Sequence, residues 1–145
     1  MSAPKVRVFF YGSFINKDVL AASGLMPGNV ETARVWGFDI RIAPLANLVR
    51  SDRHCVYGIV CETSHAELDR LYGQDWVGGY LPEAVIAETA GGGLVPALCY
   101  IAPSPAAAPA ASEYIDRIVA PAREHGFPEW YIDRIESYRP REGGE

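Results

Sequence analysis

The sequence reads Val8-Phe9-Phe10-Tyr11-Gly12-Ser13-Phe14 close to its N-terminus, and this stretch decides the fold more than any other. The apolar run predicts a buried strand over residues 6–11. It stops at a glycine turn, after which Asn16 is placed to cap a short helix from Lys17 to Ser23. A strand that ends in a tight turn before a helix N-terminus leaves backbone N–H groups pointing outward. The stretch therefore predicts a site for an anion such as a carboxylate.

Strands dominate the first two-thirds of the chain. A short helix from His65 to Leu71 interrupts them, with Ser64 and Glu67 spaced as a capping box. Gly91-Gly92-Gly93 lies between two apolar runs and predicts a hairpin. The strands are expected at about residues 6–11, 30–43, 54–62, 80–88 and 94–101.

The last third of the chain predicts helices. Residues 104–111 are rich in Pro and Ala and are interpreted as a connection. Tyr114, Ile115, Ile118 and Val119 form a helical apolar stripe, and Pro121 is expected to end or kink that helix. A second short helix should follow Pro128. Residues 141–145 are polar, and we expect them to be disordered.

Length and composition describe one domain with a sizeable core. The chain has 145 residues, 49% of them hydrophobic. Its net charge of -5 argues against a nucleic-acid partner. No apolar run reaches the length of a membrane span, and the N-terminus lacks a signal-peptide core. The three cysteines have no metal-ligand spacing and are typical of a reduced, cytoplasmic protein. We expect no metal and no cofactor; the oligomeric state is left open.

The turn Tyr11-Gly12-Ser13-Phe14 resembles the Tyr-Gly-Ser signature of the gamma-glutamylcyclotransferase-like superfamily, which includes the AIG2-like proteins. The resemblance extends over roughly the whole chain, because further matches follow in the family's order. They are Ile42–Leu48, Val56–Val60, Leu68–Gly73, Tyr80, Ser112–Ile115, His125–Pro128 and Tyr131.

The resemblance implies an α+β fold, a small mixed β-barrel with a cavity at one end. The barrel would occupy residues 1–103, and residues 104–140 would form a helical tail packed on the same domain. In the family, the Tyr-Gly-Ser turn holds a substrate carboxylate. The resemblance therefore implies that Tyr11, Gly12, Ser13 and Phe14, with Tyr80, bind the substrate. Trp36 and Trp76 are further candidates for the cavity wall.

One departure from the family concerns catalysis. The motif Leu-Asp-x-x-Glu-Gly carries the family's catalytic acid and base, and this sequence has Tyr72 in place of that glutamate. A phenol has a pKa of about 10, so it is a poor base but a good hydrogen-bond donor. Tyr72 would either fill the cavity and abolish the family's chemistry, or donate a hydrogen bond to a substrate carbonyl.

Two carboxylates could replace the missing glutamate. Asp75 lies in the loop after Tyr72, and Glu83 lies on the strand after Tyr80. Odd spacing puts Glu83 and Tyr80 on opposite faces of a regular strand, although Pro82 favours a bulge or an edge there. Both carboxylates could equally be ordinary surface groups.

The leading hypothesis is a gamma-glutamylcyclotransferase-like enzyme. It would act on a gamma-glutamyl amine, amide or related amino-acid conjugate and release 5-oxoproline, as an acyltransferase or lyase. The first alternative is a non-catalytic protein that binds a small carboxylate. The second is an altered reaction that uses Tyr72 as a hydrogen-bond donor.

Overall fold

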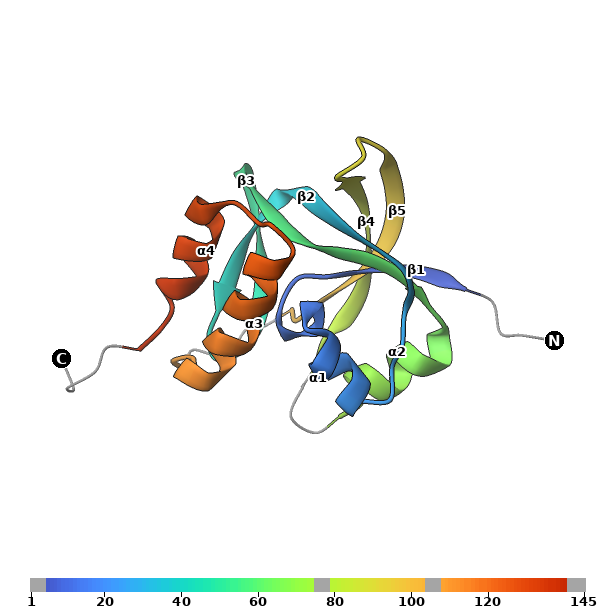
Figure 1. Ribbon diagram of the computed structural model, residues 1–145, viewed down its shortest axis with the longest axis horizontal. Helices are drawn as coiled ribbons and strands as arrows, with labels where there is room; N and C mark the ends of the chain where they lie inside the picture. Colours follow the sequence, from blue (N-terminus) through green and yellow to red (C-terminus); the bar gives the residue numbers. More distant parts are fainter. Residues whose placement is uncertain (1–4, 75–78, 104–107, 141–145) are drawn as a thin grey trace.

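A closed five-stranded barrel forms the body of the protein (Figure 1). The computed structural model describes residues 5–74, 79–103 and 108–140. The barrel order is β1-β3-β2-β4-β5, with antiparallel pairs except where β1 meets β5 in parallel. The strands are β1 (Val6–Phe10), β2 (Gly28–Ile42), β3 (Ala46–Thr63), β4 (Leu81–Thr89) and β5 (Leu94–Ile101).

Two hairpins build most of the sheet. β2 and β3 form a long hairpin, so β3 begins at Ala46 rather than near residue 54 as the sequence predicted. β4 and β5 form the hairpin predicted at Gly91–Gly93. β1 packs closely on β3 at Gly58, where a Cβ would lie 2.1 Å from the Phe10 carbonyl oxygen. Only glycine allows the two strands this approach.

Two short helical elements follow β1, and a third precedes β4. A 3-10 turn η1 (Ser13–Ile15) leads into α1 (Lys17–Ala22). As predicted, Asn16 caps α1, because its side chain accepts from the Asp18 and Val19 amides at 2.9 and 3.4 Å. The predicted capping box of α2 (His65–Tyr72) is also present.

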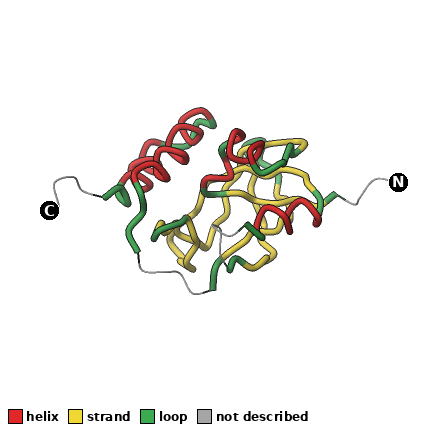
Figure 2. The backbone as a smooth tube through the Cα atoms, turned by 90° about the horizontal axis from the view of Figure 1, so that it is seen from below, coloured by secondary structure: helices red, strands yellow, loops and turns green. Residues whose placement is uncertain are grey.

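The tail consists of α3 (Ser112–Glu124) and α4 (Glu129–Glu136), which lie side by side at one end of the molecule (Figures 1 and 2). The predicted apolar stripe of α3 is buried. Pro121 was expected to end or kink α3, yet the helix continues to Glu124. A proline leaves the carbonyl four residues earlier without its donor. Here the Asn16 side-chain amide donates to that carbonyl, of Arg117, at 3.2 Å.

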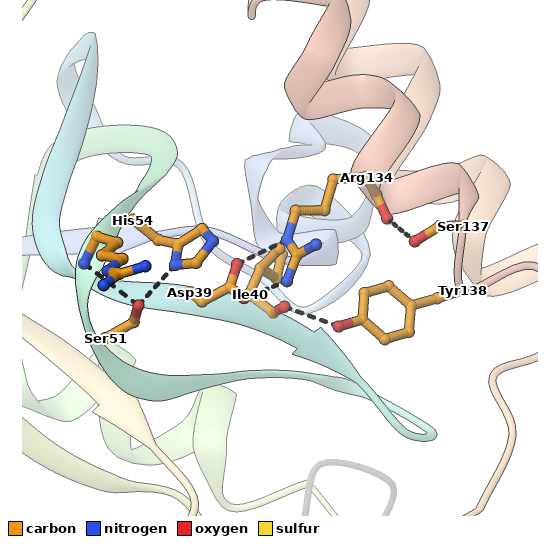
Figure 3. A network of polar contacts seen from close by, with 8 residues as sticks. Asp39, Ile40, Ser51, His54, Arg134, Ser137 and Tyr138 are labelled. Carbon is orange, nitrogen blue, oxygen red and sulfur yellow. Dashed lines mark hydrogen bonds and ion pairs between the residues drawn. The ribbon is translucent and has the colours of Figure 1, made fainter.

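Polar contacts tie α4 to the β2–β3 hairpin (Figure 3). The Arg134 guanidinium pairs with the nearly buried Asp39 carboxylate, at 2.7 Å from Nε. The Tyr138 hydroxyl donates to the Ile40 carbonyl at 3.0 Å. The tail therefore packs on the barrel as part of one core. Among the described residues, no helix is long and apolar enough to cross a membrane. Residues 141–145, predicted to be disordered, lie outside the described part.

Candidate functional site

A small cavity lies where β1 ends, at the turn that the sequence singles out. The turn Tyr11–Phe14 and Tyr72 both line it, although 58 positions separate Phe14 from Tyr72. Four tyrosines surround an otherwise apolar space. The lining residues are Phe10, Tyr11, Gly12, Ser13, Phe14, Leu45, Ala46, Tyr72, Tyr80 and Tyr114.

The turn is pressed against the first residue of β3. A Cβ on Gly12 would lie 2.7 Å from the Ala46 Cβ, so a larger residue would push the turn away. The Tyr11 hydroxyl donates to the Tyr100 carbonyl at 2.6 Å and fixes the end of β1 against β5. The turn is therefore held in place from two sides.

A phenol from the tail occupies the polar side of this turn. The Tyr114 hydroxyl oxygen accepts from the Ala46 amide at 2.9 Å. Burial raises the pKa of Tyr114, while hydrogen bonds from Ala46 and from the Ser13 side chain and amide oppose the rise. The Tyr114 hydroxyl therefore lies beside the turn for which the sequence predicts an anion site. A substrate carboxylate would compete with Tyr114 for the same donors.

Tyr72 is held by three aromatic neighbours. Its ring stacks on Tyr100 with centroids 3.9 Å apart and an interplanar angle of 9°. Phe14 meets it edge-on at 5.4 Å, and Tyr80 lies at 6.0 Å.

The environment keeps the Tyr72 phenol neutral. Burial raises its pKa well above the usual value, and the neighbouring Cys99 and tyrosines raise it further. Within the described part of the chain, no cation lowers it. The Tyr72 phenol is therefore protonated at neutral pH and can donate a hydrogen bond.

The aromatic side chains leave little room. The cavity measures about 30 Å³, while an open groove between α1 and α3 measures about 540 Å³. The prediction that the turn lies beside a cavity is confirmed, and the larger pocket lies outside the barrel. About 30 Å³ is tight for a small-molecule ligand, since ligand pockets usually measure about 300–1,000 Å³. We therefore expect the aromatic side chains around the cavity to move when a substrate binds.

Neither candidate carboxylate is seen among the described residues that line the cavity with the tyrosines. Glu83 forms an ion pair with Arg50 and lines a separate groove between β2 and β4. It does not line the cavity. Asp75 lies outside the described residues, as does Trp76. Among the described lining residues there is no carboxylate at all.

Three aromatic positions depart from the sequence reasoning. Trp36, a candidate for the cavity wall, is 57% exposed on the outer face of the barrel. Tyr114 and Tyr100 take part in the site but were not predicted there. The sequence analysis assigned Tyr114 to the apolar stripe of its helix. Only its hydroxyl group could have indicated that it also makes a polar contact.

Solved structures share this fold. No protein-family model matches the sequence, and no curated protein matches it. A structure described as a gamma-glutamyl cyclotransferase aligns over 98% of this chain and 92% of its own, with a TM-score of 0.83 and 20% identity. A yeast gamma-glutamyl cyclotransferase specific to glutathione covers 93% of this chain and 97% of its own, with a TM-score of 0.66 and 12% identity.

A mouse AIG2-like protein aligns over 68% of this chain and 78% of its own, with a TM-score of 0.55 and 19% identity. These identities are low, so the likeness establishes the fold. The chain has the α+β barrel fold of these structures, and this is the fold class that the sequence predicted.

Proposed function

We propose that the protein is a gamma-glutamylcyclotransferase-like enzyme that acts on a small gamma-glutamyl amine or amide. One observation carries the proposal: the Tyr11–Phe14 turn and the residue that replaces the family's glutamate line one cavity. The substrate's α-carboxylate would take the place of the Tyr114 hydroxyl at Ser13 and Ala46.

The reaction needs no protein base if the α-amine binds in its neutral form. The amine nitrogen then attacks the γ-carbonyl carbon and closes the five-membered ring. Tyr72 donates a hydrogen bond to the carbonyl oxygen as negative charge develops there. The C–N bond to the leaving amine breaks, and that amine takes up the proton lost by the attacking nitrogen. The products are 5-oxoproline and a free amine.

The experiment is 5-oxoproline release from gamma-glutamyl-alanine and gamma-glutamyl amines by purified protein. We expect slow turnover that increases with pH as more of the substrate amine becomes neutral. General acid–base catalysis typically supplies about 10²–10⁴-fold, and that factor would be missing. Complete inactivity across the series at every pH would contradict the proposal.

A second candidate is a non-catalytic protein that binds a small carboxylate. The absence of a carboxylate among the described lining residues favours it. In that case 5-oxoproline or acetate would perturb the amides of Ser13 and Ala46 in NMR spectra, while no gamma-glutamyl compound would be turned over.

A further inference from the structure

A further concave surface lies between β2 and β4, at the place where the barrel has its fewest paired residues between antiparallel strands. These two strands pair only at Ala33–Thr89 and Arg34–Glu88. Beyond that point they separate and leave a groove of about 490 Å³. Its lining residues are Val35, Trp36, Phe38, Arg50, Glu83, Ala84, Val85, Ile86, Glu88 and Leu94.

The register of the β4–β5 hairpin shows where the main chain of β4 points. Residues opposite one another in an antiparallel pair alternate between hydrogen-bonded and non-bonded pairs. Pro82 stands opposite Tyr100 and Pro96 opposite Ile86. Prolines have no N–H, so both pairs fit the non-bonded set, and Ala84 between them falls in the same set.

The ends of the strand agree with this assignment. The Thr89 amide donates within the hairpin to the Gly93 carbonyl at 2.8 Å. The Ala90 amide donates to Thr32 of β2 at 3.0 Å, so even-numbered residues face β2. The N–H and C=O groups of Ala84 and Ile86 therefore point into the groove, where no described strand pairs with them. Pro82 marks an edge, as the sequence suggested.

The walls of the groove are apolar and exposed. Trp36, Ile86 and Leu94 are 57%, 58% and 70% exposed. Large apolar side chains gathered at one exposed place usually mark an interaction site.

The charged groups of the groove are already paired with one another. Arg50 pairs with Glu83 at one end. Arg34 pairs with Glu88 at the other, at 2.7 Å. The groove therefore offers no unpaired charge to a partner and favours an uncharged occupant.

We propose that this groove binds an extended, uncharged segment of a partner protein with one apolar face, which pairs with the part of β4 that β2 leaves unpaired. The open main-chain groups of Ala84 and Ile86 specify an extended chain rather than a helix. The exposed Trp36, Ile86 and Leu94 side chains favour an apolar face on that segment. This inference does not depend on the proposed enzymatic function.

The test uses the peptide acetyl-Val-Thr-Val-Thr-Val-amide and two N-methylated isomers, one methylated at its valines and the other at its threonines. Successive residues of a strand direct their N–H groups to opposite edges. A peptide that pairs through one edge therefore loses binding in only one isomer. We expect the parent peptide, at millimolar concentration, to slow amide exchange at Ala84 and Ile86 and leave Val85 and Ala87 unchanged.

Two surface substitutions complete the design. Ile86→Lys should weaken peptide binding by about tenfold or more, which corresponds to 1.4 kcal/mol. Met26→Lys is the matched control, because Met26 is also strongly exposed but does not line the groove. Equal binding by the two isomers, or unchanged exchange at Ala84 and Ile86, would overturn the proposal. So would protection of these amides that depends on protein concentration without peptide, since a second copy would then occupy the edge.

Discussion

Replacing Tyr72 by phenylalanine separates the role of its hydroxyl from the role of its ring. The variant keeps the stack on Tyr100 and the edge contact with Phe14. The change removes only the phenolic oxygen and leaves the ring in place. We therefore expect the free energy of unfolding to change by less than about 1 kcal/mol.

Activity should respond very differently. Removing one donor from a developing oxyanion typically costs about 10²–10³ in kcat. We expect Tyr72→Phe to lower kcat for 5-oxoproline release by about that factor and to leave KM within about twofold. The assay measures 5-oxoproline under single-turnover and steady-state conditions, with thermal unfolding measured on the same samples.

Tyr138→Phe is the matched control. The Tyr138 hydroxyl donates to the Ile40 carbonyl at 3.0 Å, away from the cavity. Its loss should destabilise the fold by about 0.5–1.5 kcal/mol and leave kcat unchanged. The argument for Tyr72 as donor is refuted if Tyr72→Phe retains the kcat of the parent protein, or if its kcat falls only in proportion to a loss of folded protein.

Three further predictions concern the same site. Tyr72→Glu should raise 5-oxoproline release by about 10²–10⁴-fold, because it supplies a base and opens the cavity; a variant no faster than the parent would show that more than this residue is missing. Gly12→Ala should destabilise the fold by about 1–3 kcal/mol and abolish carboxylate binding, because its Cβ meets the Ala46 Cβ at 2.7 Å; urea unfolding and ligand titration check both. Stability should fall as the pH rises above about 10, because the unfolded chain loses phenolic protons there while the folded chain keeps them. The expected slope is about 1.4 kcal/mol per pH unit for each buried tyrosine, and unfolding curves that do not change at alkaline pH would contradict it. The tyrosines whose pKa is raised are Tyr11, Tyr72, Tyr80, Tyr100, Tyr114 and Tyr131.

The sequence predicted most helices and hairpins correctly, because caps and turns are determined by residues that are neighbours in the chain. The cap at Asn16, the capping box of α2 and the hairpin at Gly91–Gly93 each depend on a few neighbouring residues. Pro121 was expected to end or kink α3, and the helix does not end there. The sequence could not show this, because the donor that replaces its missing N–H at Arg117 comes from Asn16, which is distant in sequence.

In the site, too, local motifs were predicted correctly and contacts between distant residues were not. The turn Tyr11–Phe14 and its partner at position 72 were predicted from motifs, and both line the cavity. The contribution of Tyr114 was missed, because an apolar stripe on a helix does not show which distant group a tyrosine hydroxyl will contact. Trp36 was misplaced because an aromatic residue in a strand suits either face, and here the outer face holds it.

The size of the cavity and its chemistry have one physical origin. The ring of Tyr72 fills the space because Tyr100, Phe14 and Tyr80 pack around it. The same packing removes water from the phenol, raises its pKa and excludes the phenolate. Raising the pH therefore cannot turn Tyr72 into the missing base before the fold itself loses stability. Under the proposed function, a base at this position requires a different side chain, and we expect a substrate to displace the ring. The proposal therefore makes one residue responsible for both the space in the cavity and the missing proton transfer.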